Sequence, residues 1–247
     1  MLNATQSAET NNELLPYDPT ILFEHYRSYE NNDPQIIKFW IYQLIGKYKN
    51  MIFKQADKYQ GKNFLQIGSG EGNLYENFVN LDSHNKLSLK CFSGDKVFRH
   101  DLREKLPFQN DCFRGIYTEH CLEHLNPRQS FEVLRESFRV LKPGGVLRVI
   151  VPDAEKYVNY YLAKRNGDDV SLFEGFDGWK LGSEALRGLT CYVGHATLYD
   201  FHLLNCYLSY IGFRDIKKVN FLEGSMFELL KDSEGRRWNS LYVEAIK

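Results

Sequence analysis

The sequence lacks both a marked excess of charge and a long apolar stretch. Its 31 lysines and arginines nearly balance its 32 aspartates and glutamates, so the formal net charge is -1. Such a chain has no global field that attracts nucleic acid or an anionic membrane surface. No stretch approaches about 18 consecutive apolar residues, the length typical of a transmembrane helix. We therefore expect a protein that binds no nucleic acid and has no membrane span.

The sequence also has few cysteines and no apolar leader. The five cysteines are odd in number, lie far apart and form no CxxC pair: Cys91, Cys112, Cys121, Cys191 and Cys206. This spacing argues against a disulfide framework and against a structural zinc site. The first residues, "MLNATQSAETNNELLPYDP", contain neither the basic segment nor the apolar core of a secretory signal. We expect a soluble, cytoplasmic protein, and nothing in the sequence indicates its oligomeric state.

Three regions follow one another along the chain. Residues 1–18 are polar, and we expect a flexible N-terminus there. Residues 19–60 show helical periodicity, and Asp33-Pro34 is a good helix start, so we predict a helical cap that packs on the core and can also roof a substrate pocket. Residues 61–247 have the pattern of one α/β domain, with a less regular insertion at about 154–192.

Short apolar runs alternate with helical patterns in the α/β domain. The predicted strands lie in "NFLQIG", "ENFVNLD", "KVFRHD", "FRGIYTEH" and "VLRVIVPD". A helix is predicted over 128–145, closed by Pro143-Gly144-Gly145, and a last helix ends at Gly212. The closing runs "RDIKKVNFLEG" and "SLYVEAIK" are expected to pair antiparallel. The sequence therefore predicts a Rossmann-like α/β fold with a mostly parallel seven-stranded sheet and an antiparallel last strand.

A glycine-rich turn follows the first predicted strand. Gly68, Gly70 and Gly72 give the spacing G-x-G-x-G, whereas a dinucleotide fingerprint requires its third glycine or alanine at the position of Asn73. The turn still lies where open α/β sheets bind their ligands, at the carboxyl ends of the strands. The spacing disfavours NAD but does not by itself select another nucleoside cofactor.

An acidic residue at the end of the next strand can accept hydrogen bonds from the two hydroxyls of a ribose. Asp82, which ends "ENFVNLD", is the preferred candidate, and Asp95 in "CFSGD" is the alternative. Asp82 follows Gly68 closely, which leaves little room for a full crossover helix. Asp95 leaves hardly any chain before the next strand reaches Asp101.

Several segments in one order resemble the class I S-adenosylmethionine-dependent methyltransferases, in particular the small-molecule methyltransferases of type 11. The segments are "FLQIGSGEG", "FVNLD", "HDLREKLPFQNDCFRGIYTEHCLEHL", "VLKPGGVLRVIVPD", "GHATLYDFHLL", "GFRDI" and "SLYVEAIK". The resemblance covers about Lys62 to Lys247. It implies S-adenosyl-L-methionine as the cofactor.

The resemblance also implies a cofactor site residue by residue. Gly68, Ser69, Gly70 and Gly72 would line the methionine portion, and Asp82 would hold the ribose. Asp101 and Leu102 would lie beside the adenine, and the strand end Thr118, Glu119 and His120 would face the sulfonium. Many relatives have an acidic residue where this chain has Gln66, whose amide can accept a hydrogen bond from the cofactor's amino group but carries no charge.

We expect a small-molecule or glycan-like acceptor that is methylated at oxygen, and a hydroxyl acceptor benefits from a general base. The candidate catalytic residues are His120, Glu119 and His195, of which His120 comes first after the strand. The alternative from another class is a catalytically idle module that binds the cofactor or a partner. Gln66 and the lack of a single evident base motivate that alternative.

The segment "HCLEH" raises a remote alternative, a zinc hydrolase. His120, Glu123 and His124 match the H-x-x-E-H pattern of inverted zinc peptidases. However, the segment follows a strand directly and ends at Asn126-Pro127, which leaves about one helical turn, whereas such a zinc site needs a long helix and a third ligand. We therefore expect no metal site.

Overall fold

The computed structural model describes residues 61–70, 74–82, 97–171, 179–191 and 194–247. The expected flexible N-terminus, the helical cap over 19–60, Gly72 and Asp95 lie outside the described residues. Among the described residues, no helix is both long and apolar enough to span a bilayer.

One sheet of seven strands forms the centre of the protein, in the order β3-β2-β1-β4-β5-β7-β6. Neighbouring strands are parallel except at β7, which runs antiparallel to β5 and to β6. This confirms the predicted mostly parallel sheet with an antiparallel last strand. The strands are β1 (Phe64–Ile67), β2 (Phe78–Asp82), β3 (Val97–Arg99), β4 (Phe113–Glu119), β5 (Leu141–Pro152), β6 (Arg214–Val219) and β7 (Ser240–Ile246).

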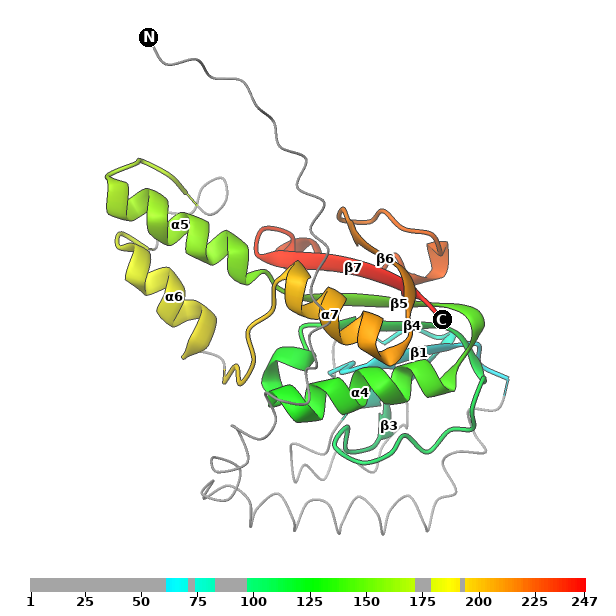
Figure 1. Cartoon of the computed structure of the whole chain (residues 1–247). Coiled ribbons are helices and arrows are strands. Elements are labelled where there is room, and N and C mark those ends of the chain that lie inside the picture. The colour runs from blue at the N-terminus through cyan, green and yellow to red at the C-terminus, as the bar shows by residue number, and fades with distance from the viewer. Residues whose placement is uncertain (1–60, 71–73, 83–96, 172–178, 192–193) are drawn as a thin grey trace, which may run out of the picture.

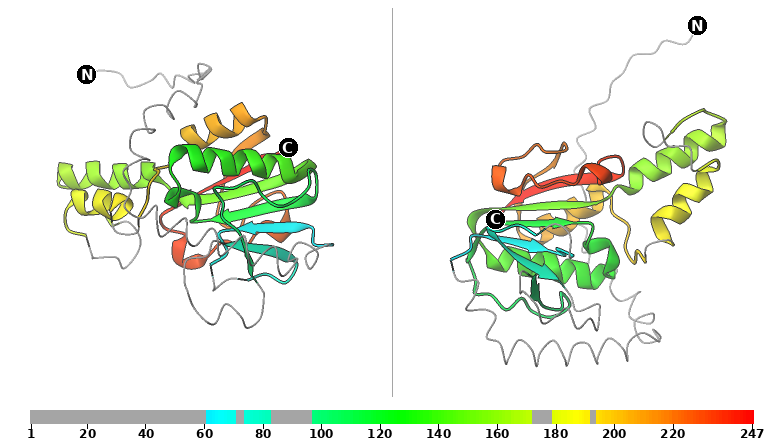
Figure 2. Two further views of the ribbon diagram at one scale, coloured as in Figure 1. Left: turned by 90° about the horizontal axis from the view of Figure 1, so that it is seen from below. Right: turned by 180° about the vertical axis from the view of Figure 1, so that it is seen from behind.

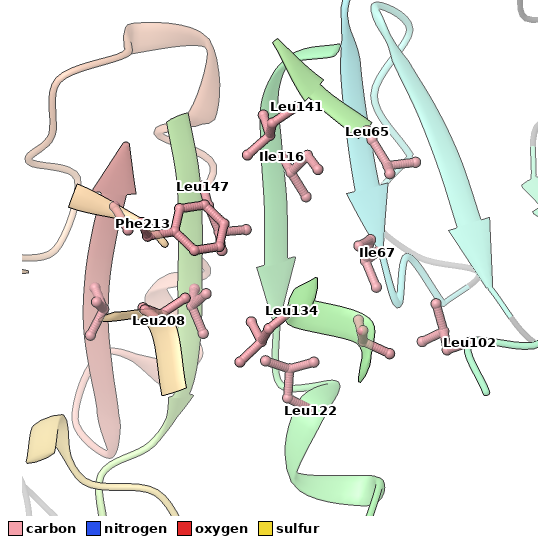
Figure 3. Packing of buried hydrophobic residues seen from close by; sticks show 14 of the residues in the cluster. Leu65, Ile67, Leu102, Ile116, Leu122, Leu134, Leu141, Leu147, Leu208 and Phe213 are labelled. Atoms are coloured by element: carbon pink, nitrogen blue, oxygen red, sulfur yellow. The ribbon is translucent and has the colours of Figure 1, made fainter. Parts of the chain in front are cut away.

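Helices α4 (Pro127–Val140) and α7 (Phe201–Ile211) cover the same face of this sheet (Figures 1 and 2). Asn126 caps α4, and the predicted end of the last helix at Gly212 is confirmed by its left-handed backbone. Alternate strand residues such as Leu65 and Ile67 point toward these helices and form the main core (Figure 3). The burial of this continuous apolar layer is the main source of stability.

The opposite face of the sheet is covered by the chain between β6 and β7, which includes η3 (Phe227–Leu229) and η4 (Glu234–Arg236). A charged network lies within this second layer. Arg148 of β5 is fully buried and donates through Nε to Asp232 at 2.8 Å and through Nη1 to Glu244 at 3.0 Å. The same guanidinium donates to the carbonyl oxygen of Glu223 at 2.8 Å. Arg148 therefore fastens the β6–β7 connection onto the sheet.

Two local predictions are wrong. The segment Pro143-Gly144-Gly145 does not close a helix, because α4 ends at Val140 and the strand β5 begins at once. Phe113 pairs with Leu141 and Gly115 with Val146, so the proline and glycines form a bulge within the strand. Pairing with β4 and burial of Leu141 outweigh the local preference for a helix end.

The expected less regular insertion contains two regular helices, α5 (Ala154–Asn166) and α6 (Gly182–Thr190). They lie side by side beyond the end of β5 and project away from the sheet (Figures 1 and 2). Tyr157 and Tyr160 are buried between them, whereas Val158 and Leu162 remain exposed. Apolar side chains on both faces of α5 hid the helical period in the sequence.

Candidate active site

The glycine turn after β1 is held against the end of β2. The backbone amides of Gly68 and Ser69 donate to the carbonyl oxygen of Leu81 at 2.9 and 3.0 Å, and the amide of Gly70 donates to Oδ2 of Asp82. Gly68 and Gly70 both have positive φ angles, of 74° and 58°. The turn and the predicted ribose carboxylate are therefore neighbours at the carboxyl edge of the sheet, where open α/β folds bind nucleosides.

Gly68 also lies directly against the turn that follows β4. A Cβ atom at this position would lie 2.4 Å from both Cβ and Sγ of Cys121. Burial raises the pKa of the Cys121 thiol, so this cysteine remains protonated and serves as packing rather than as a nucleophile. The close approach of the two turns requires glycine at position 68.

We expect Gly68→Ala to destabilise the protein more than Gly61→Ala does, by about 1–3 kcal/mol, because it adds overpacking to backbone strain. Gly61 is the matched control, because its φ is also positive, at 93°, but nothing lies within 4 Å of an added Cβ. Urea unfolding of both variants measures the difference. Equal losses of stability in the two variants would show that Cys121 moves away from the added Cβ atom at no cost in free energy.

The predicted adenine residues lie at the end of β3. Oδ1 of Asp101 accepts hydrogen bonds from the backbone amide and Nε of Arg103 at 2.8 and 3.1 Å, and Leu102 is buried. The amide of His100 donates to the carbonyl oxygen of Asp82 at 2.9 Å, which ties this strand end to that of β2. Burial lowers the pKa of the His100 imidazole, so it is neutral beside the two aspartates. Asp82 and Asp101 thus lie at neighbouring strand ends on one edge of the sheet.

Gln66 provides an observation that bears on the cofactor. Its side chain is buried in β1, and its Oε1 has no hydrogen-bond partner among the described residues. Buried amide oxygens are rarely left without a donor. An amino group brought by a ligand would satisfy this oxygen, so the residues present fit the methionine end of S-adenosylmethionine. Thr118 is buried in the neighbouring strand, where it pairs with Ile67.

Glu119 and His120, at the end of β4, both contact the β6–β7 connection. Glu119 accepts hydrogen bonds from the amide and hydroxyl of Ser233 at 2.9 and 2.6 Å. His120 has a φ of 47°, an unusual value for a residue other than glycine. Its Nε2 lies 2.8 Å from Oγ of Ser240, and its Nδ1 lies 2.8 Å from Nη1 of Arg236. Since a guanidinium can only donate, Nδ1 is the unprotonated nitrogen.

His195 approaches the same edge from the segment that follows α6. Its Nδ1 lies 2.6 Å from the carbonyl oxygen of Leu189, and its Nε2 lies 4.0 Å from Oε1 of Glu123. Burial lowers the pKa of the His195 imidazole, although the Leu189 carbonyl and the Glu123 charge oppose this effect. His120 is also near Glu123, with 3.3 Å between Nδ1 and Oε1.

The structure thus brings His120 and His195 together around Glu123, in the 3-10 turn η2 (Leu122–His124). Sequence reasoning considered Glu123 only within the H-x-x-E-H pattern. The brevity of η2 agrees with the expectation that this segment forms about one helical turn. His120 and His195 are 75 positions apart in the sequence, and no local pattern indicated that they meet.

Part of the chain matches a known protein family. Residues 65–149 match the family model described as "Methyltransferase domain". No curated protein matches the chain.

Solved structures of methyltransferases are similar to the chain at low identity. One is a SAM-dependent methyltransferase from Archaeoglobus fulgidus, 19% identical, with 87% of this chain and 100% of that chain covered and a TM-score of 0.49. Another is a SAM-dependent methyltransferase from Thermotoga maritima, described as a possible histamine N-methyltransferase, which is 17% identical, with 86% of this chain and 96% of that chain covered and a TM-score of 0.45.

The matched model begins within β1, at Leu65, and ends within β5, so it spans the glycine turn, Asp82, Asp101 and the end of β4. The cofactor of this family is S-adenosylmethionine, and the orphaned oxygen of Gln66 and the turn beside Asp82 fit it. Over residues 65–149, the chain is thus similar to the S-adenosylmethionine-dependent methyltransferases, and its sheet order agrees with this similarity.

Proposed function

We propose that this protein transfers a methyl group from S-adenosylmethionine to a hydroxyl oxygen of a small-molecule or glycan-like acceptor. The observation that carries the proposal is the contact of the glycine turn with both the end of β2 and the turn after β4. This contact brings the residues that we assign to the cofactor next to a cluster of histidines. S-adenosylmethionine supplies a methyl group that its sulfonium already activates, so the protein has mainly to position the reactants.

The residues that we assign to the cofactor bind it through hydrogen bonds and through close packing. Gln66, Ser69 and the glycines of the turn receive the methionine portion, with the orphaned Gln66 oxygen accepting from its amino group. The carboxylate of Asp82, which accepts a hydrogen bond from the amide of Gly70, accepts hydrogen bonds from the ribose hydroxyls. Asp101 and Leu102 flank the adenine, and Thr118 and Glu119 close the site at the strand end.

His120 is the general base in this proposal. Its unprotonated Nδ1 contacts Arg236, an exposed side chain that can turn into solvent when an acceptor arrives. The carboxylate of Glu123, 3.3 Å from the same nitrogen, would then stabilise the imidazolium that forms when the acceptor hydroxyl gives up its proton. His195 lies near the same carboxylate, with 4.0 Å between its Nε2 and Oε1 of Glu123.

The acceptor side is built by parts of the chain that lie beyond the strand ends. Helices α5 and α6 and the segment 194–200 lie beyond the strand ends, next to His195. The carbonyl oxygen of Tyr199 accepts from the amide of Ala154, which ties this segment to the start of α5. Such additions determine acceptor choice in folds that are shared by many functions.

Calorimetry with S-adenosylmethionine and S-adenosylhomocysteine tests the cofactor half of the proposal. We expect the full chain to bind both, and Asp82→Ala to weaken binding about 10- to 100-fold, because hydrogen bonds to a charged group are worth about 1.5–3 kcal/mol. Asp168→Ala is the control, since Asp168 is an exposed aspartate just after α5. Absence of binding by the intact chain, or equal affinities of the two variants, would refute the proposed cofactor site.

A turnover experiment tests the other half of the proposal, the transfer of the methyl group to a hydroxyl oxygen. The protein is incubated with S-adenosylmethionine carrying a ¹³C methyl group and a metabolite extract, and the chemical shift of the product methyl carbon separates O-methyl from N-methyl products. An O-methyl product supports the proposal, and an N-methyl product refutes the oxygen assignment. Binding without any transfer would instead favour a catalytically idle module.

A further inference from the structure

The carboxylate of Glu123 is buried without hydrogen-bond donors. Glu123 is 1% exposed, and neither of its side-chain oxygens has a hydrogen-bond partner among the described residues. A buried carboxylate in this situation is costly unless a cation neutralises it. Only two ion-pair partners are recorded for it in the described part of the chain, the imidazoles of His120 and His195.

When neutral, neither imidazole can donate a hydrogen bond to the carboxylate of Glu123, because its single N–H group is engaged elsewhere. Nδ1 of His195 lies 2.6 Å from the carbonyl oxygen of Leu189, which can only accept, so Nδ1 carries the proton and the bare Nε2 faces Glu123. Nδ1 of His120 is bare as well, because it accepts from Arg236. The lone pair of His195 Nε2 therefore faces a carboxylate that receives no hydrogen bond from either imidazole, an arrangement that attracts a cation.

A third imidazole completes the cluster. One nitrogen each of His124 and His195 and one oxygen of Glu123 all lie within 4.8 Å of one another. The rings of His124 and His195 meet edge to face, with 5.1 Å between their centroids. Nδ1 of His124 lies 3.4 Å from the carbonyl oxygen of Gly194. Contacts between ring nitrogens and backbone carbonyls are typical of histidines that ligate metals, because they fix the tautomer and the ring orientation.

The backbone holds the ligands in place from both sides. The amides of Ala196 and Thr197 donate to the carbonyl oxygen of Glu123 at 2.7 and 3.1 Å, and the hydroxyl of Thr197 donates to the carbonyl oxygen of Leu125 at 2.6 Å. The segment that carries His195 is thereby fastened to the turn that carries Glu123 and His124. Ligands from two distant parts of the chain are brought together before any ion arrives, which lowers the entropic cost of binding.

We propose that Glu123, His124 and His195 form a binding site for one divalent transition-metal ion, with Zn²⁺ as the best-fitting class. Two imidazoles and one carboxylate are a ligand set of zinc sites that keep a further position open. Bond lengths of about 2.0–2.2 Å require the three ligand atoms to move closer together. His124 is exposed, so its ring is free to turn and also provides the path by which the ion enters.

This site differs from the peptidase pattern that the sequence suggests. His120 is not a ligand, because Arg236 and Ser240 occupy both of its ring nitrogens. Glu123 binds the ion instead of serving as a base. Because the cluster lies beside His120, an open coordination position of the ion can receive the acceptor hydroxyl and lower its pKa, as zinc does for a bound water. Metal binding itself does not depend on the proposed methyl transfer.

Titration of the metal-free, tag-free full chain with Co²⁺ tests the site. Calorimetry gives the stoichiometry, and the visible absorption bands of Co²⁺ report the coordination geometry. We expect one ion per chain, and a loss of at least about tenfold in affinity for His124→Ala, His195→Ala and Glu123→Gln, since even partners that only orient ligands contribute 10- to 100-fold. His202→Ala is the matched control, because His202 is an exposed histidine of α7.

The outcomes separate the metal site from its alternatives. His124→Ala changes an exposed side chain, so it tests the site even where a buried replacement unfolds the protein. Substoichiometric binding by the wild-type chain would overturn the proposal and leave a protonated histidine as the partner of Glu123. Equal losses in His124→Ala and His202→Ala would also overturn it, because they would indicate surface binding only. Binding of Co²⁺ that persists when S-adenosylmethionine fails to bind would support the metal site and refute the proposed methyl transfer.

Discussion

Replacement of Arg148 by alanine is expected to lower the free energy of unfolding by about 3–5 kcal/mol, the usual cost of removing one partner from a buried ion pair. The guanidinium is 0% exposed and binds Asp232 and Glu244, whose side chains are 0% and 6% exposed. Without it, two carboxylates remain in a low-dielectric layer with no positive charge between them. The β6–β7 connection also loses the hydrogen bond from Arg148 to the Glu223 carbonyl.

Urea unfolding monitored by circular dichroism measures this loss, and Arg135→Ala is the matched control. Arg135 pairs with Glu132 on the surface of α4, with side chains 61% and 41% exposed, so its replacement should cost at most about 1 kcal/mol. Similar stabilities of the two variants would contradict the importance of the buried network. Hydrogen exchange adds a local measurement, because Ser233 follows Asp232 directly, and its amide should lose protection in Arg148→Ala.

Replacement of His120 by alanine is expected to reduce kcat by about 10²- to 10⁴-fold, the range that general bases contribute. The affinity for S-adenosylmethionine should be unchanged, because the ring contacts Arg236, Ser240 and Glu123 rather than the glycine turn. This prediction depends on the proposed function. It is measured as the initial rate of methyl transfer to the acceptor identified in the turnover experiment, with calorimetry on the same preparation.

Imidazole added to His120→Gly provides a sharper test, since a small base can occupy the space left by the ring. Partial recovery of the rate with rising imidazole concentration is the expected result. His202→Ala serves again as the control and should retain the full rate. A His120→Ala variant with wild-type turnover would exclude the residue as the base. Loss of cofactor binding in that variant would instead assign it a structural role.

Local patterns predicted the strands that carry the cofactor residues because the signal for each is contained within a few residues. Apolar runs that end in glycine or aspartate marked β1 and β2, and the glycine turn and Asp82 lie together at the sheet edge as expected. The sheet topology followed from the alternation of strand and helix patterns. By contrast, the pairing of Leu141 with Phe113 overrode the helix-ending signal of Pro143-Gly144-Gly145, because strand pairing depends on residues distant in sequence.

The sequence by itself determined the order of the strands, the glycine turn, the acidic strand ends and hence the similarity to the methyltransferases, since these are properties of short continuous segments. Only the tertiary structure decided which polar side chains meet. Glu123 and His195 are separated by 72 residues and come together because the segment after α6 returns to the end of β4. Arg148 meets Asp232 because the β6–β7 connection folds back over β5. Such contacts depend on chain closure over long distances, which no local pattern encodes.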